Sequence, residues 1–229
     1  MMQTFRENYE CILERIGRAA ERSDRSADTV TMVAVTKYFS GVEEVRALYA
    51  LGCRDFAENR AALLQEKHGL LLEEAPDIRW HFIGPLQKNK ARRVLGCAKI
   101  IHSVESLDLL KTLDRIAQEK GVVSSVFFEV NISGEAAKHG FSRESLASVW
   151  GSLSDFPHLK VKGFMGMTSL HASERDAHEQ FRTLREIRDQ FLPGGELSMG
   201  MSHDFEIAIE EGATMVRIGS ALFEDFSSF

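Results

Sequence analysis

Residues 31–40, TMVAVTKYFS, place a lysine directly after a short apolar run. The apolar residues at 32–35 include β-branched side chains without polar alternation, which predicts a strand buried on both faces. A charged Lys37 at the end of such a strand needs either solvent or a specific partner. The residues that follow the other predicted strands help to decide whether Lys37 meets solvent or a specific partner.

Seven further short runs of β type follow along the chain, at 53–58, 79–84, 98–103, 124–130, 160–166, 196–200 and 214–219. Helical patterns lie between them, at 42–52, 59–71, 86–96, 106–121, 142–153, 173–191 and 203–212. Regular alternation of strands and helices is typical of βαβ units and a parallel sheet. The eight units predict an α/β fold with a single closed (β/α)8 barrel, and an open doubly wound sheet is the alternative.

An additional helix is expected before the barrel. Residues 4–22 gather apolar side chains on one helical face, namely Phe5, Tyr9, Ile12, Leu13 and Ile16. No GxGxxG motif follows the first strand, which disfavours a dinucleotide-binding version of the open sheet. We therefore expect one domain over residues 1–229.

Composition excludes several classes of protein. A net charge of −6 argues against a general nucleic-acid binder. The three cysteines form no CxxC pair, and scattered histidines indicate no metal site. The first residues have no apolar core of signal-peptide type, and no run approaches the roughly 20 apolar residues of a membrane helix. We expect a cytoplasmic monomer that binds neither nucleic acid nor a membrane.

Candidate binding residues gather at the carboxyl ends of the strands, where barrels carry their active sites. Closing the barrel makes the first and last strands neighbours, so Lys37 is expected beside Gly219 and Ser220. Loops after the seventh and eighth strands often hold a phosphate, and here they contain GMSHD and IGS. Glycine lets backbone N–H groups approach a phosphate, and Ser202 and Ser220 add hydroxyl donors. A phosphorylated carbonyl compound held on Lys37 as a Schiff base fits this set.

Each of these residues also has an ordinary structural interpretation. Lys37 could be a solvated surface residue, and Ser202 could cap a helix that begins near His203. Arg217 could pair with a core carboxylate such as Glu129. The convergence of Lys37, Ser202 and Arg217 on one rim of the barrel favours the binding interpretation.

The sequence alone does not decide the roles of three other features. His81 and His102 either face the barrel mouth or lie in its core, bonded to a neighbour. The basic segment LQKNKARR at 86–93 is either a solvated face or a contact for an anionic partner. Methionines at 165, 167, 199 and 201 are expected to serve packing.

Several motifs in chain order are similar to the YggS/PROSC family of pyridoxal-phosphate (PLP) homeostasis proteins. They are VAVTK (33–37), AEN (57–59), WHFIGPLQKNK (80–90), VNISGEAAKHGF (130–141), GFMGM (163–167), LSMGMSHDFEIAI (197–209) and VRIGSALF (216–223). Some of them are weak alone, but the series is specific and covers most of the chain. The family pattern often has threonine at Ser220 and glycine at Ala57, and both departures are small.

The resemblance implies a PLP-binding barrel similar to the N-terminal domain of alanine racemase. It implies that Lys37 holds the cofactor as a Schiff base. The other cofactor-binding residues that it implies are Asn59 near the cofactor, Arg217 near the pyridine nitrogen, and Ser202, Gly219 and Ser220 around the phosphate. It implies no metal ion and no assigned catalytic residue.

A guanidinium beside the pyridine nitrogen disfavours its protonation, which makes the ring a poor electron sink. Racemases of this barrel type add a tyrosine from another domain, whereas Tyr9, Tyr38 and Tyr49 are poorly placed for that role. We therefore expect a PLP carrier in vitamin B6 homeostasis rather than an enzyme. The alternatives are a PLP-dependent amino-acid racemase or lyase, and a Schiff-base aldolase for a phosphorylated carbonyl substrate.

A carrier of this kind would hand PLP to apo forms of PLP-dependent enzymes. Transfer could pass through a second lysine, for which Lys138 and the lysines of QKNK, Lys88 and Lys90, are the candidates.

Overall fold

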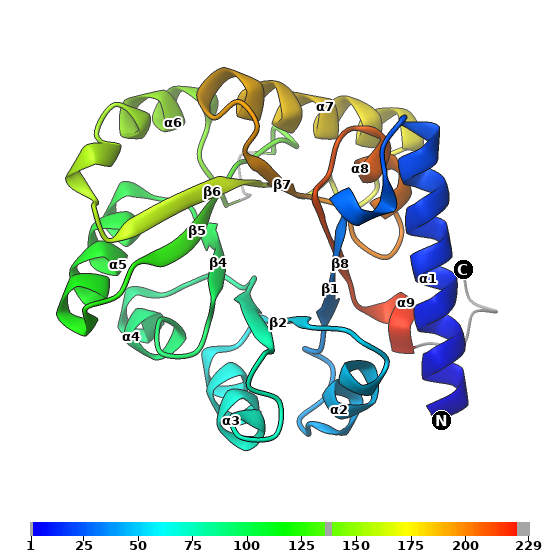
Figure 1. Ribbon diagram of the computed structural model, residues 1–229. Coiled ribbons are helices and arrows are strands. Elements are labelled where there is room, and N and C mark those ends of the chain that lie inside the picture. Colours follow the sequence, from blue (N-terminus) through cyan, green and yellow to red (C-terminus); the bar gives the residue numbers. More distant parts are fainter. Residues whose placement is uncertain (1, 136–138, 224–229) are drawn as a thin grey trace.

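The computed structural model describes residues 2–135 and 139–223 of the 229-residue chain, and side chains from residue 5 onward. Its centre is a closed barrel in which each strand pairs in parallel with the next, and β8 pairs with β1 (Figure 1). The strands are Thr31–Val35 (β1), Asp55–Glu58 (β2), Arg79–Phe82 (β3), Ile100–Val104 (β4), Ser124–Glu129 (β5), Leu159–Met165 (β6), Glu196–Ser198 (β7) and Met215–Ile218 (β8). The predicted closed barrel is confirmed, and the open sheet is wrong.

Helices surround the barrel between successive strands (Figure 1). They are Glu43–Ala50 (α2), Ala61–Leu71 (α3), Ala91–Val94 (α4), Leu107–Lys120 (α5), Arg143–Trp150 (α6), Glu174–Phe191 (α7) and Phe205–Glu210 (α8), and the short helix Ser220–Phe223 (α9) follows β8. The predicted N-terminal helix is α1, Met2–Arg22, which contacts α8 and α9 on the outside of the barrel. Short 3-10 turns span Ala27–Thr29, Lys88–Lys90 and Leu153–Asp155.

The predicted helix at 86–96 differs most from the observed structure. Gln87 has an extended backbone with ψ of 137°, so no helix can include it. A 3-10 turn and the single turn of α4 follow, and Ala91 and Val94 bury their side chains. The 3-10 turn and α4 together leave the basic side chains of this segment exposed to solvent.

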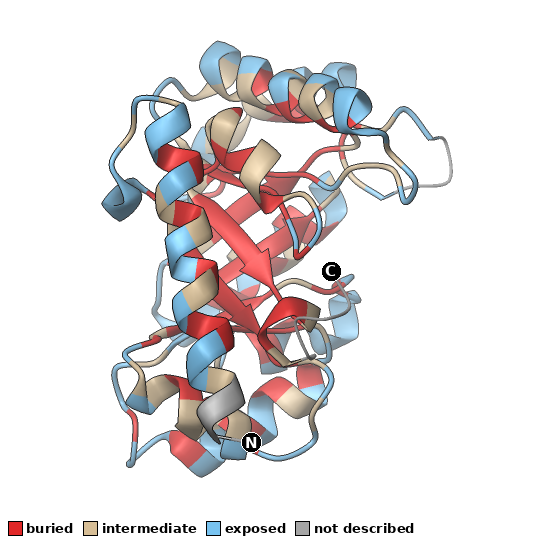
Figure 2. Cartoon of the chain, turned by 90° about the vertical axis from the view of Figure 1, so that its right-hand side faces the viewer, coloured by how far each residue is buried: buried red, intermediate tan, exposed pale blue. Residues whose placement is uncertain are grey.

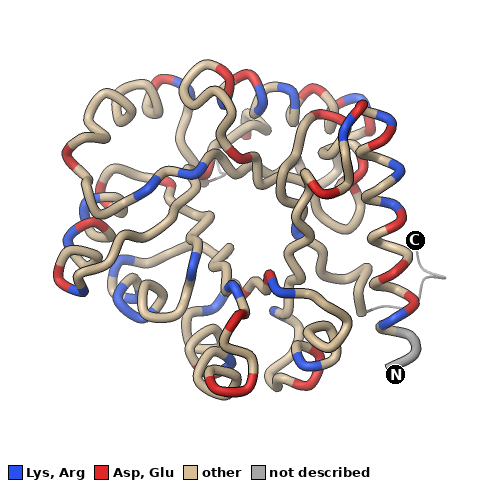
Figure 3. The backbone as a smooth tube through the Cα atoms, viewed as in Figure 1, with Lys and Arg blue, Asp and Glu red and all other residues tan. Residues whose placement is uncertain are grey.

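Burial explains why the strands are so apolar. Most strand residues are buried, apart from the first half of β6, whereas the helices alternate buried and exposed positions (Figure 2). A small cluster inside the barrel includes Val33, Val35 and Phe127, and a larger cluster between barrel and helices includes Met32 and Ala34. Successive residues of β1 therefore point to two different apolar layers. Charged residues lie mainly on the outer helices and loops (Figure 3).

Candidate functional site

A cavity of about 350 Å³ lies at the carboxyl ends of the barrel strands. All of the sequence-predicted site residues line it, namely Lys37, Asn59, Ser202, Arg217, Gly219 and Ser220. Residues that sequence reasoning did not assign to the site also line it, among them Tyr38, Pro85, Met165, Met167 and Met201. The fold thus brings residues from both ends of the chain to one place.

Lys37 stands at the end of β1, next to the loop that follows β8. Ala34 lies opposite Ile218 in the β1–β8 pair, so the two strands end side by side. The Lys37 amine lies 5.1 Å from the centre of the Tyr38 ring, a distance at which a cation is attracted to the aromatic face. Lys37 therefore follows two residues after a strand that is buried on both faces, and it lies at the rim of the cavity.

A buried ion pair fixes the strand ends that carry Lys37 and Asn59. The Lys67 ammonium on α3 donates to Glu58 Oε1 at 2.5 Å and to the Thr36 carbonyl at 2.9 Å. The Thr36 hydroxyl donates to the same Glu58 oxygen at 2.7 Å. Lys67 and Glu58 have no exposed side-chain surface. Sequence reasoning missed Lys67, although its place between Leu64 and Leu71 on the apolar stripe of a helix was a usable signal.

Ser202 does not cap α8, the helix that follows it, which corrects one of the alternatives. The helix α8 begins at Phe205, and Asp204 accepts a 2.7 Å hydrogen bond from the Met201 N–H at this turn. The Ser202 hydroxyl instead accepts from the backbone N–H groups of Gly219 and Ala221, both at 3.3 Å. Its own proton stays available to donate, so Ser202 joins the loops after β7 and β8 and keeps a donor.

Two glycines shape this region. Gly200 has φ of +91°, and a Cβ there would lie 2.6 Å from the Ala208 Cβ, so only glycine lets the loop pack on α8. A Cβ at Gly219 would lie 3.1 Å from the Tyr38 ring, in space that borders the cavity. Glycine at this position keeps the backbone approachable for a ligand.

Arg217 is buried, with 4% of its surface exposed. Its guanidinium donates to the Ser198 carbonyl and hydroxyl, both at 2.7 Å, and to the Gly166 carbonyl at 3.2 Å. It makes no ion pair with Glu129, so that alternative is wrong; both residues belong to the described part of the chain. Burial lowers the pKa of Arg217 to about 10, which leaves it charged at neutral pH.

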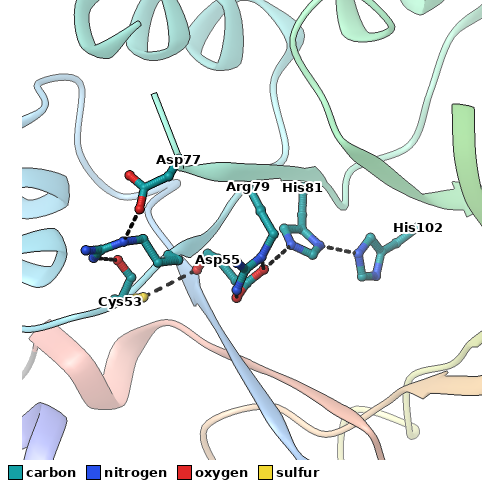
Figure 4. Close-up of polar contacts among 7 residues, drawn as sticks. Cys53, Asp55, Asp77, Arg79, His81 and His102 are labelled. Carbon is teal, nitrogen blue, oxygen red and sulfur yellow. Dashed lines mark hydrogen bonds and ion pairs between the residues drawn. The ribbon is translucent and has the colours of Figure 1, made fainter. Parts of the chain in front are cut away.

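A series of hydrogen bonds runs from Arg217 through the barrel interior, and Figure 4 shows its part from His102 to Asp55. The Ser198 hydroxyl lies 2.9 Å from His102 Nδ1, and His102 Nε2 lies 2.8 Å from His81 Nδ1. His81 Nε2 lies 3.0 Å from Asp55 Oδ1, which also accepts from Arg79 at 2.7 Å. The two histidines therefore lie in the core, bonded to one another.

The ionised carboxylate of Asp55 sets the direction in which protons are donated along this series of hydrogen bonds. Burial alone raises the pKa of Asp55, but hydrogen bonds from His81 and Arg79 hold it below its usual value, so Asp55 only accepts. Burial, with the charges of His81 and Arg217, keeps the pKa of His102 well below its usual value, so His102 is neutral. When His81 is neutral as well, each histidine carries its proton on Nε2. The Ser198 hydroxyl then donates to His102 and accepts from Arg217.

Glu129, at the end of β5, is the one carboxyl near the cavity with a strongly raised pKa among the described residues. Burial raises its pKa to about 7, and the nearby charge of Glu105 adds to this effect. It lines an adjoining cavity with Asn131 and His139. Lys138, a candidate for a second PLP-accepting lysine, lies outside the described residues.

Within the described ranges, no three His, Cys, Asp or Glu side chains are grouped to hold a metal ion. In the same part of the chain, no helix is both long and apolar enough to cross a membrane.

The alanine racemase N-terminal domain is the family whose model matches, over residues 5–225. The chain is 40% identical to the pyridoxal phosphate homeostasis protein of Pseudomonas aeruginosa, across 97% of this chain and 96% of that one. It is 38% identical to the protein of the same name from Aquifex aeolicus, across 93% and 94% of the two chains. The solved structure of PipY from Synechococcus elongatus, with PLP bound, covers 93% of this chain and 100% of its own at 35% identity and a TM-score of 0.81.

The closed barrel and the match to the family model together define a protein of the alanine racemase N-terminal domain class. Within that class, the chain belongs to the family of pyridoxal phosphate homeostasis proteins. The resemblance inferred from the sequence motifs is thereby confirmed.

Proposed function

We propose that this protein binds PLP in the cavity at the barrel mouth and acts in PLP homeostasis. The observation that carries the proposal is the convergence of Lys37, Arg217 and the Ser202–Ser220 hydroxyls on one cavity of about 350 Å³. PLP supplies an aldehyde that reacts reversibly with amines, and a phosphate that needs donors. The relatives' names and the PLP-bound PipY structure support the same cofactor.

The residues around the cavity fit both ends of this cofactor. The Ser202 and Ser220 hydroxyls and the Cβ-free backbone at Gly219 suit a phosphate. Asn59 lines the cavity, and its Oδ1 atom is buried without a hydrogen-bond partner, as expected of a side chain whose partner is a ligand. The amine of Lys37 is the group that we assign to covalent attachment.

Arg217 is the residue that we assign to the pyridine nitrogen. It is charged, it lines the cavity, and two backbone carbonyls and the Ser198 hydroxyl anchor its guanidinium. A fixed cation at this position disfavours a protonated ring nitrogen, which a strong electron sink requires. The site is therefore built to hold the cofactor, and we propose a carrier without robust turnover rather than a racemase, a lyase or an aldolase.

We also propose an oligomeric state, a cellular compartment and recipients of PLP for this protein. We infer a monomeric, single-domain cytoplasmic protein over residues 1–229, which passes PLP to apo forms of PLP-dependent enzymes. Its three cysteines are free, in keeping with a reducing compartment. The recipients are proteins that themselves hold PLP on a lysine.

Spectroscopic titration with PLP tests this proposal. The protein should develop visible absorbance at stoichiometric PLP, and Lys37→Ala should lose it while keeping its far-UV circular dichroism. Lys111→Ala is the matched control, because Lys111 is exposed on α5 and lines neither this cavity nor its neighbour. Normal absorbance in Lys37→Ala would reject the assignment of the lysine. Rapid racemisation of alanine by the loaded protein would reject the carrier role.

A further inference from the structure

A second cavity of about 400 Å³ lies beside the first, between the start of α3 and the turns that lead into α4. It shares Asn59 and Pro85 with the first cavity. The basic segment at 86–93 contributes Lys90 and Arg93 to its wall, and the loop after β2 contributes Arg60. The proposed PLP site makes no use of these three cations.

The charges that line this cavity have one sign. Arg60, Lys90 and Arg93 line it, and no Asp or Glu does. Within the described part of the chain, none of the three has a carboxylate within ion-pair distance. Their neighbours Lys88 and Arg92 do, because they pair with Asp108 and Glu119. The chain has a net charge of −6, but three cations without carboxylate partners make the electrostatic potential around this cavity positive. A positive potential favours the binding of an anion.

The backbone and the apolar wall add to this arrangement. The eleven-residue helix α3 begins at Ala61 with no side-chain cap, so its first N–H groups have no side-chain acceptor. Arg60 is held near the first cavity, since its guanidinium donates to the Lys37 carbonyl at 3.3 Å. Phe82 and Pro85 form an apolar part of the wall. The blue positions along α4 in Figure 3 are its basic residues.

We propose that this second cavity binds the phosphate group of a small phosphate monoester. Three cations can neutralise the two negative charges of a phosphate monoester. Arg60 and Arg93 can each donate two parallel hydrogen bonds to phosphate oxygens. A cavity of about 400 Å³ exceeds one phosphate ion, so an organic remainder can lie against Phe82 and Pro85. This site lies beside the PLP cavity and shares Asn59 and Pro85 with it, but it includes neither Lys37 nor the loops after β7 and β8.

Calorimetric titration with inorganic phosphate and with phenyl phosphate tests this proposal. Both probes should bind, and phenyl phosphate should bind more tightly because of its apolar part. Arg93→Gln and Lys90→Gln should each weaken binding about tenfold, since each removes a charge-assisted contact. Arg92→Gln is the matched control, because it changes the same charge on the adjacent residue, which pairs with Glu119 outside the cavity.

A further variant separates the two cavities. Ser220→Ala should leave unchanged the phenyl phosphate binding that Arg93→Gln weakens, because Ser220 lines only the first cavity, where any binding of the probe is a separate event. Absence of saturable binding of either probe would overturn the proposal, as would equal affinities in Arg93→Gln and Arg92→Gln. Loss of binding in Ser220→Ala with normal binding in Arg93→Gln would place the probe in the first cavity and overturn it too. Failure of PLP binding itself would leave these results unaffected.

Discussion

Replacing Lys67 by methionine should destabilise the protein more than any surface substitution. The side chains of Lys67 and Glu58 are fully buried, and the ammonium makes hydrogen bonds of 2.5 Å to Glu58 and 2.9 Å to the Thr36 carbonyl. Methionine fills similar volume but leaves the Glu58 carboxylate buried with only the Thr36 hydroxyl as a donor. The second Glu58 oxygen already has no hydrogen-bond partner.

The magnitude follows from the charge that is left without its partner. Removing one member of a buried ion pair costs about 3–5 kcal/mol of unfolding free energy. For a chain of this length, that loss lowers the Tm by roughly 6–20 °C. Glu58→Gln combined with Lys67→Met removes the buried charge, so the double variant should lose only about 1–3 kcal/mol for its imperfectly bonded amide.

Urea unfolding followed by circular dichroism measures these differences. Lys111→Met is the matched control, because Lys111 is exposed on α5 and should change stability by less than about 0.5 kcal/mol. Equal stability of Lys67→Met and this control would show that the buried ion pair does not stabilise the fold. A double variant less stable than Lys67→Met would show that the buried charge is not the cause of the loss.

Three further predictions concern the site. Ser220→Ala should raise the Kd for PLP about fivefold to tenfold in a fluorescence titration, because one hydrogen bond to the phosphate is worth about 1 kcal/mol. Asp55→Asn should let a fraction of His81 and His102 move their proton to Nδ1, seen by 15N NMR without any ligand, because an amide can also donate to His81. Glu129 has a folded-state pKa of about 7 against an ordinary 4.5, so the folded protein binds the extra proton and loses stability as pH rises between these values. Glu129→Gln lacks this loss, so its stability relative to the wild type should rise by up to about 3 kcal/mol between pH 5 and pH 8.

Each of these has a contradicting outcome. An unchanged Kd in Ser220→Ala would remove the hydroxyl from the phosphate contacts. Histidine tautomers that stay on Nε2 in Asp55→Asn would show that the carboxylate does not set the direction of the chain. A constant stability difference between Glu129→Gln and the wild type across pH would place the pKa of Glu129 near its ordinary value.

The barrel was predictable because its strands are buried on both faces. Continuous apolar runs such as residues 32–35 report that burial directly, and alternation with helices then leaves few topologies. The neighbourhood of Lys37 and Gly219 followed from closure alone. The loop after β7 was harder, because the acceptor role of Ser202 toward Gly219 depends on how the loops after β7 and β8 meet and not on capping of α8.

The polar interior was beyond sequence reasoning for a different reason. His81 and His102 lie on adjacent strands, and their contact depends on a register in which His81 lies opposite Ile100. Nothing in the local sequence separates such a pair from two histidines at the mouth. Lys67 differs, because a lysine on the apolar stripe of a helix signals a buried partner even though it does not name Glu58.

Borohydride reduction of the PLP-loaded protein, followed by peptide mapping, tests most directly whether Lys37 holds PLP. We expect one pyridoxyl adduct, on Lys37, with Lys67 and the exposed lysines unmodified at stoichiometric PLP. An adduct confined to another lysine, or no adduct, would contradict the assignment of the barrel-mouth cavity as the cofactor site.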